Sequence, residues 1–355
     1  MHNFELTEEQ QMVLETVGKF VQDVAEPKAL EHDEHGRFVR PQFDQLAELG
    51  MLGLPVAEDA GGAGMGFVAT VVALETVAGA CGSTARLLAV QAGVCASALS
   101  GLAPGAELLG ELASGSRLAS WIGPESGVQA TGTGDSVKLQ GKAPLVTAAT
   151  EADVFVVAAM ADGEAVLATV PRAAVRTAAV PALGLRAAAP GCVEMAAADA
   201  TVVARGADAE AAWARARVAA AVATAAIACG LNAASLRLTT RHAGERIAFG
   251  KPLAAQPAVA HKLVEMRRRL HAARHATYHA ARLLDAGVDA TEAAWLAKIE
   301  AIEGAVLAAD EGIQIHGGYG YVVEYHVERH YRDAKTLEVL EDGLETLRDR
   351  LVAPA

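Results

Sequence analysis

Apolar residues recur at helical spacing through the first third of the chain. Thr7 and Gln10 frame a capping box, and the apolar positions between Met12 and Val24 return every three or four residues. The later helical runs are predicted over residues 41–50, 69–80 and about 85–102. This pattern predicts an α-helical domain over residues 1–115.

Short apolar runs then replace the helical pattern. Residues 136–139 alternate between polar and apolar, which is typical of a half-buried strand. Residues 154–159 and 165–170 are continuous apolar runs, and Asp162-Gly163 between them is a hairpin signal. The pattern predicts a β domain over residues 116–206.

The last third of the chain is helical again. Long Ala-rich helices are predicted over residues 208–245, 257–286 and 291–315, followed by a final helix after Glu341. Long helices with short connections are typical of an antiparallel bundle, here a four-helix bundle over residues 207–355. The fold class expected is therefore mostly α with a central β domain.

Charge excludes one class of partner. The 355 residues include 43 Asp and Glu but only 30 Lys and Arg, which gives a net charge of −13. Binding to nucleic acid or to an anionic membrane surface needs clustered basic residues, so we expect neither. The longest apolar stretch, Val218 to Leu231, is short and Ala-rich, and it predicts no membrane span.

The expected location is the cytoplasm. Met1 to Glu5 lacks a basic region followed by an apolar run, so no signal peptide is predicted. The cysteines form no CxxC pair and are interpreted as small buried apolar residues of a reducing compartment. They are Cys81, Cys95, Cys192 and Cys229.

No metal site is expected. His271, His275 and His279 share one helix face, but no carboxylate or cysteine has the matching spacing, and arginines surround them. We interpret them as a solvated or interface face. Arg332 and Asp333 are interpreted as a structural ion pair, and the absence of a G-x-S-x-G motif counts against a hydrolase.

The most informative stretch begins at Gln314. Gly317, Gly318 and Gly320 are three glycines in four residues, and they end a long helix. Glycines also let a ligand or another chain approach the backbone closely, and bare amides there could face a pyrophosphate. A plain helix stop and a binding loop both fit this pattern.

This stretch closely resembles the C-terminal signature of the acyl-CoA dehydrogenase family. The resemblance runs without gaps through Arg332-Asp333-Ala334-Lys335 to Glu341. Residues 6–10, 49–54 and 61–64 also resemble the family, and so does its R-x-x-F-G-x-P element at residues 246–252. The resemblance covers the whole chain. It implies the acyl-CoA dehydrogenase fold, with a β-barrel-like middle domain, and FAD as cofactor.

The resemblance also implies that subunits share FAD. Arg246 and Phe249 match the residues that touch the ADP half of an FAD bound mainly by a neighbouring subunit. Gln314, Gly317 and Gly318 match a loop that meets the same FAD. A guanidinium suits phosphate, and glycines allow backbone contact.

The implied reaction is α,β-dehydrogenation of an acyl thioester. Glu341 matches the catalytic base, which takes the α-proton while flavin N5 accepts the hydride. Such a base is expected in an apolar pocket with a raised pKa. Thr147 matches a residue that hydrogen-bonds near flavin N5, although Leu145 replaces the family's tryptophan.

Several partners follow from the resemblance. The substrate would be an acyl-CoA or an acyl-carrier-protein thioester, and electrons would leave through an electron-transfer flavoprotein. The assembly would be a homo-oligomer, or a hetero-oligomer with a related subunit.

Departures from the family cluster on one side of the site. Ile122 replaces a threonine that meets the flavin, Val128 replaces a serine, and Ala221 replaces an arginine that orients CoA. Asp342-Gly343 stands where the family has G-T, so a threonine that helps to hold FAD is missing. One alternative is therefore a degenerate partner subunit that completes a neighbour's FAD site. A second is a flavin monooxygenase on the same fold, against which Glu341 counts.

Overall fold

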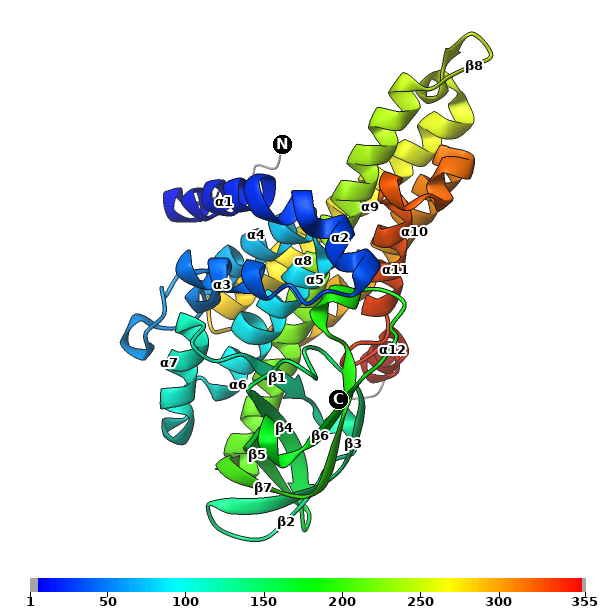
Figure 1. The fold of residues 1–355 in the computed structure, drawn as a ribbon. Coiled ribbons are helices and arrows are strands. Elements are labelled where there is room, and N and C mark those ends of the chain that lie inside the picture. The colour runs from blue at the N-terminus through cyan, green and yellow to red at the C-terminus, as the bar shows by residue number, and fades with distance from the viewer. Residues whose placement is uncertain (1–5, 353–355) are drawn as a thin grey trace.

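The computed structural model describes residues 6–352, so the stretch Met1 to Glu5 on which the signal-peptide expectation rests lies outside it. A helical layer comes first, a twisted sheet follows, and long helices run through the centre and project beyond it as an arm (Figure 1). The molecule is mostly helical with a central β domain, as the sequence predicts.

The first layer begins at the predicted capping box. The Gln10 amide donates to Thr7 Oγ1 at 3.2 Å, and the Thr7 amide donates to Gln10 Oε1 at 3.1 Å. The predicted run over 85–102 is one helical stretch over residues 82–99, interrupted by a π-helical segment at Ala89–Cys95. The helices of this layer are α1 (Glu8–Phe20), α2 (Glu26–His35), α3 (Arg40–Glu48), α4 (Gly66–Ala78), α5 (Gly82–Leu88), α6 (Ala96–Leu99) and α7 (Ala106–Ser114).

The sheet closes on itself like a barrel. Its order is β1-β4-β2-β3-β7-β5, and β4 also pairs with β5 through the predicted Asp162-Gly163 hairpin. Both turn residues have positive φ, which a two-residue hairpin of this kind requires. The strands are β1 (Ala119–Ile122), β2 (Gln129–Thr131), β3 (Ser136–Val146), β4 (Val154–Ala161), β5 (Glu164–Pro171), β6 (Arg176–Ala179) and β7 (Gly191–Arg205).

The C-terminal helices surround α8. This helix is long and apolar enough to cross a membrane by length and composition, but 94% of its most apolar window is buried inside the protein. Its apolar character is that of a core helix. The C-terminal elements are α8 (Gly206–Glu245), β8 (Ile247–Ala248), β9 (Lys251–Pro252), α9 (Pro257–Asp285), α10 (Thr291–His316), α11 (Val327–Leu337) and α12 (Leu344–Val352).

Helix α8 crosses α4 at a glycine. A Cβ on Gly230 would lie 2.3 Å from the Glu75 carbonyl oxygen, so only glycine permits this crossing. Small side chains line the rest of α8, where most residues between Ala216 and Ser235 are buried. The alanine-rich composition thus lets the central helix pack closely against its neighbours on several sides.

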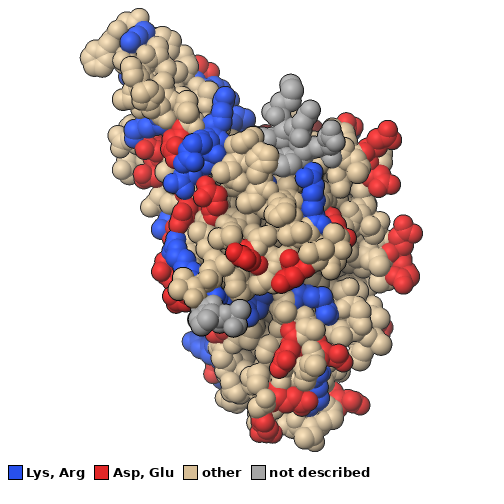
Figure 2. All heavy atoms as spheres, turned by 180° about the vertical axis from the view of Figure 1, so that it is seen from behind, with Lys and Arg blue, Asp and Glu red and all other residues tan. Residues whose placement is uncertain are grey.

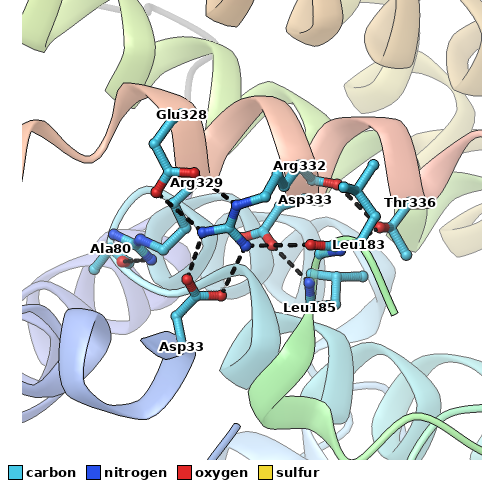
Figure 3. A network of polar contacts seen from close by, with 10 residues as sticks. Asp33, Ala80, Leu183, Leu185, Glu328, Arg329, Arg332, Asp333 and Thr336 are labelled. Atoms are coloured by element: carbon cyan, nitrogen blue, oxygen red, sulfur yellow. Dashed lines mark hydrogen bonds and ion pairs between the residues drawn. The ribbon is translucent and has the colours of Figure 1, made fainter. Parts of the chain in front are cut away.

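A polar joint ties α11 to the other two parts of the molecule (Figure 3). Arg332 binds Glu328 on its own helix and Asp33 on α2, with nearest contacts of 2.6 Å to each. Asp333 accepts from the Leu185 amide at 2.6 Å, and Arg329 donates to the Ala80 carbonyl at 3.0 Å.

The predicted pairing of Arg332 with Asp333 is therefore wrong. Arg332 and Asp333 are neighbours in sequence, but each is drawn to a different part of the fold. Adjacent residues of a helix point in different directions, so their side chains do not face each other.

The joint predicts a stability effect. Replacing Arg332 with Ala leaves the buried Asp33 carboxylate without its cation, which should lower the free energy of unfolding by about 3 kcal/mol. Arg37→Ala is the control, because the Arg37–Glu31 pair is exposed on both sides and should contribute less than about 1 kcal/mol. Urea unfolding of both variants measures the difference. Equal effects would contradict the assigned role.

Candidate active site

Glu341 lies in the turn between α11 and α12, in a strained backbone conformation. Its φ is +49°, in the left-handed region that non-glycine residues rarely adopt. The buried Lys298 of α10 holds the turn, because its Nζ donates to the Leu340 carbonyl at 2.9 Å and to the Asp342 carbonyl at 2.8 Å. The ammonium thus fixes the peptide groups on both sides of Glu341.

Arg86 of α5 binds the Glu341 carboxylate. The two side chains form an ion pair through Nη2 and Oε1, and Nη1 contacts Oε2 at 3.3 Å. Only 4% of the Arg86 side chain and 10% of the Glu341 side chain are exposed. The carboxylate of Glu341, the predicted base, is therefore already paired with the Arg86 guanidinium.

The expectation of a raised pKa at Glu341 is wrong. Burial pushes the pKa of this carboxyl upward, but the charges of Arg86 and Lys298 outweigh burial, so the pKa lies below its ordinary value. The carboxyl stays ionised but binds a proton weakly. An apolar pocket alone would have given the opposite shift.

Thr147 contacts the same guanidinium group of Arg86. Arg86 Nε donates to Thr147 Oγ1 at 2.9 Å, and the Thr147 carbonyl accepts from Ser120 Oγ at 2.5 Å. The structure therefore brings the two predicted residues Glu341 and Thr147 together, but with Arg86 between them. Thr147 is buried at the end of β3.

A cavity of about 140 Å³ remains beside these groups. Ile122, Leu145 and Glu341 are among its walls, and Arg86 closes one side. Ligand sites in proteins usually measure about 300–1,000 Å³. The space beside Arg86 is therefore smaller than most ligand sites while Arg86 stays in place.

Further charged side chains line this cavity or lie close to it. Glu125 also lines the cavity, and although the residue is exposed, partial desolvation and the nearby carboxylates Glu341 and Asp342 raise its pKa. Asp342 accepts from Arg217 Nε at 2.7 Å. Arg217 lies one turn before Ala221 on α8, so an arginine is present near the position of the missing one, but it binds the protein's own carboxylate.

The other predicted residues lie at the far end of the molecule. Arg246 and Phe249 belong to the β8–β9 hairpin, at the tip of the arm (Figure 1). Phe249 is 96% exposed and has a φ of +53°, and Arg246 and Ile247 are also exposed. Ile247 and Phe249 are two exposed apolar side chains close together at this tip, which makes the tip a candidate contact surface.

The glycine loop lies close to this hairpin. Gln314, Gly317 and Gly318 are exposed at the end of α10. His316 beside them stacks on His242 of α8, with ring centroids 4.2 Å apart. The stack holds the ends of α8 and α10 together, which places the glycine loop and the hairpin on the same arm (Figure 1). A Cβ on Gly317 or Gly318 would meet nothing within 4 Å, so both backbones are open to an approaching group.

The residues present therefore fit FAD at one place and not at the other. The arm offers an exposed arginine, an exposed aromatic ring and open glycine backbone, which suit a dinucleotide held by another chain. The cavity beside Glu341 is closed by Arg86. On the face shown in Figure 2, acidic and basic side chains are scattered over a surface that is mostly uncharged.

Sequence reasoning missed Arg86 and Lys298. A signal existed for both, because each is a single cation in an otherwise apolar helical run, where an unpaired charge is not tolerated. The sequence pattern does not show which group pairs with either cation. The partner of Arg86, Glu341, is 255 residues away in the sequence. Among residues 6–352 no group of three or more His, Cys, Asp or Glu is arranged to hold a metal ion.

Comparisons with known proteins show the family and the fold. Residues 7–106 match the family described as acyl-CoA dehydrogenase, N-terminal domain, and residues 211–353 match acyl-CoA dehydrogenase, C-terminal domain. A probable acyl-CoA dehydrogenase of Bacillus subtilis, YngJ, is 33% identical over 98% of this chain and 97% of its own. The short-chain specific acyl-CoA dehydrogenase of Clostridium acetobutylicum is 28% identical, over 97% of each chain.

Solved structures have the same fold. Butyryl-CoA dehydrogenase from Megasphaera elsdenii superposes with a TM-score of 0.91 and 26% identity, over 98% of each chain. A structure reported with the electron transferring flavoprotein of Acidaminococcus fermentans has a TM-score of 0.92 and 25% identity, over 99% of this chain and 100% of that one. The chain therefore belongs to the acyl-CoA dehydrogenase family of FAD-dependent oxidoreductases that act on CH–CH bonds.

Proposed function

We propose that this chain is the FAD-completing subunit of an acyl-thioester dehydrogenase. It would supply the arm surface to an FAD held by a related subunit, and the assembly would carry out α,β-dehydrogenation of an acyl-CoA or acyl-carrier-protein thioester. The observation that carries the proposal is the contrast between a closed cavity at Arg86 and an open surface at Arg246 and Phe249.

A second copy of the chain does not offer an open flavin pocket to the arm surface. In a symmetric dimer, each arm would meet the pocket of the other copy, and the Arg86–Glu341 ion pair of that copy closes this pocket. A related subunit with an open flavin pocket would give the exposed Phe249 and the glycine loop a partner. This supports the hetero-oligomer over the homo-oligomer. The two relatives reported above are bacterial acyl-CoA dehydrogenases, which favours dehydrogenation over monooxygenation and the cytoplasm as the location.

When bound by the neighbouring subunit, FAD supplies the acceptor for the hydrogen that leaves the β-carbon. The similarity to a structure reported with an electron transferring flavoprotein supports such a protein as the next electron acceptor.

The second candidate is a complete active site with Glu341 as the base. Its support is the register of Glu341 within the family signature and its burial next to Thr147. It requires Arg86 to leave the carboxylate before an α-proton can be taken. Release of a buried ion pair costs about 3 kcal/mol or more, so this candidate needs an additional movement that the first does not.

Flavin content separates the two candidates. The chain expressed alone should purify nearly colourless, because its own cavity is closed. Co-expressed with each acyl-CoA dehydrogenase homologue of its source genome, it should form one complex that holds one FAD for two subunits. Absorbance spectra and native mass spectrometry measure both quantities. Full FAD occupancy of the chain alone, with reduction by an acyl-CoA, would support the second candidate instead.

The arm should be needed for assembly but not for folding. Phe249→Asp combined with Arg246→Glu should leave the melting temperature nearly unchanged, because both side chains are exposed. The same change should lower the FAD content of the co-expressed complex about tenfold or more. Met12→Asp is the matched control, because Met12 is an exposed apolar residue on α1, away from the arm. An unchanged complex would contradict the assigned surface.

The state of Glu341 can be read from acid unfolding. Because its folded pKa lies below the ordinary value of 4.5, its ion pair stabilises the protein above that pH, and this stability is lost as pH falls through the folded pKa. Glu341→Gln should lower the free energy of unfolding by about 3 kcal/mol at pH 7. The difference from the wild type should shrink only below about pH 4.5.

The Glu341 charge helps to raise the pKa of Glu125, so the comparison is made between Glu125→Gln and Glu125→Gln with Glu341→Gln. Both variants are measured by urea unfolding between pH 3 and pH 8. A difference that changes instead between about pH 5 and pH 7 would indicate a raised pKa, as a general base requires. That result would favour the complete active site.

A further inference from the structure

We propose that the Arg86 side chain prevents a flavin ring from entering this chain's own cavity, and that removing this side chain lets a flavin ring bind there. The inference rests on the proposed function, since it names the residue that makes this subunit the one without flavin. It concerns only the residues around Arg86.

Arg86 connects three walls. Its backbone belongs to α5, its Nε contacts Thr147 at the end of β3, and its terminal nitrogens contact Glu341 in the turn before α12. A single side chain thus spans the junction of the helical layer, the sheet and the C-terminal helices. The guanidinium suits this role because its nitrogens donate in several fixed directions.

Arg86 also borders two spaces. Arg86 lines both the cavity of about 140 Å³ and a smaller space of about 10 Å³. They share further walls, namely Leu145, Val146, Thr147 and Leu340. Because the same strand end and turn bound both spaces, removal of the Arg86 side chain would join them into one larger cavity.

The rest of the pocket wall is held independently of Arg86. Lys298 fixes the carbonyls on either side of Glu341, and it is itself only 1% exposed. Asp342 is held by Arg217 at 2.7 Å and by Arg350 at 2.9 Å. These contacts keep the turn in place when the Arg86 ion pair is removed, so the space would open instead of collapsing.

The cavity that would open is lined for an aromatic ring. Ile122, Leu145 and Leu340 offer apolar contacts, and Thr147 Oγ1 is released from Arg86 Nε to bond with a ligand. Removing Arg86 alone would leave the Glu341 carboxylate buried without its main partner, which is strongly destabilising. The test therefore removes both charges.

The variant tested is Arg86→Ala with Glu341→Gln. Riboflavin and FAD are titrated against it and against the wild-type chain alone, with flavin fluorescence and equilibrium dialysis as readouts. We expect the double variant to bind riboflavin about tenfold more tightly or better than the wild type does. Arg86→Lys should show no gain, because the cation and its pairing with Glu341 are kept.

The matched control is Arg274→Ala with Glu75→Gln. This ion pair is also buried, with side chains 14% and 11% exposed, but it lines a different cleft between α1, α4, α8 and α9. An equal gain in riboflavin affinity in the two double variants would mean that a general loss of packing causes the binding. That result would overturn the proposal. Thermal melts confirm that each variant is folded.

A folded double variant that binds riboflavin no better than the wild type overturns the inference. In that case the proposed function still stands if the wild-type chain remains colourless alone and completes FAD binding with a related subunit. A wild-type chain that already holds stoichiometric FAD contradicts the proposed function itself. The two failures are therefore distinguishable.

Discussion

The ion pair between Arg86 and Glu341 is the constraint on which the rest of the site depends. Two opposite charges are buried where water cannot solvate them, so neither can leave without exposing the other to an uncompensated apolar environment. The pair draws the end of β3 and the turn before α12 onto α5. Arg86 thereby fills part of the cavity, helps to lower the pKa of Glu341 and contacts Thr147 at the same time.

This arrangement divides the molecule into a closed half and an open half. Near the sheet, cations and carboxylates satisfy one another, and little space remains for a ligand. At the end of the arm, the His242–His316 stack holds two helix ends so that an aromatic ring, an arginine and bare glycine backbone face outward. This contrast between a filled cavity and an exposed arm is what the proposed function rests on.

The fold was largely predictable, because each element carries its own local signal. The capping box at Thr7, the Asp162-Gly163 hairpin and the long alanine-rich helices all depend on residues near one another in sequence. The pairing of Arg332 and the pKa of Glu341 were predicted wrongly for the opposite reason. Each depends on charges from elements far away in the chain, namely Asp33 for the first and Arg86 with Lys298 for the second.

The sequence by itself determined the family and the order of helices and strands, and it predicted residues for contact with FAD. Those properties are carried by local periodicity and by motifs of adjacent residues. Only the tertiary structure decided that Glu341 and Thr147 share one guanidinium, and that the arm residues lie together at the opposite end of the molecule. The physical reason is that a buried charge is governed by what surrounds it in space, and residue 86 reaches residue 341 only after the chain has folded.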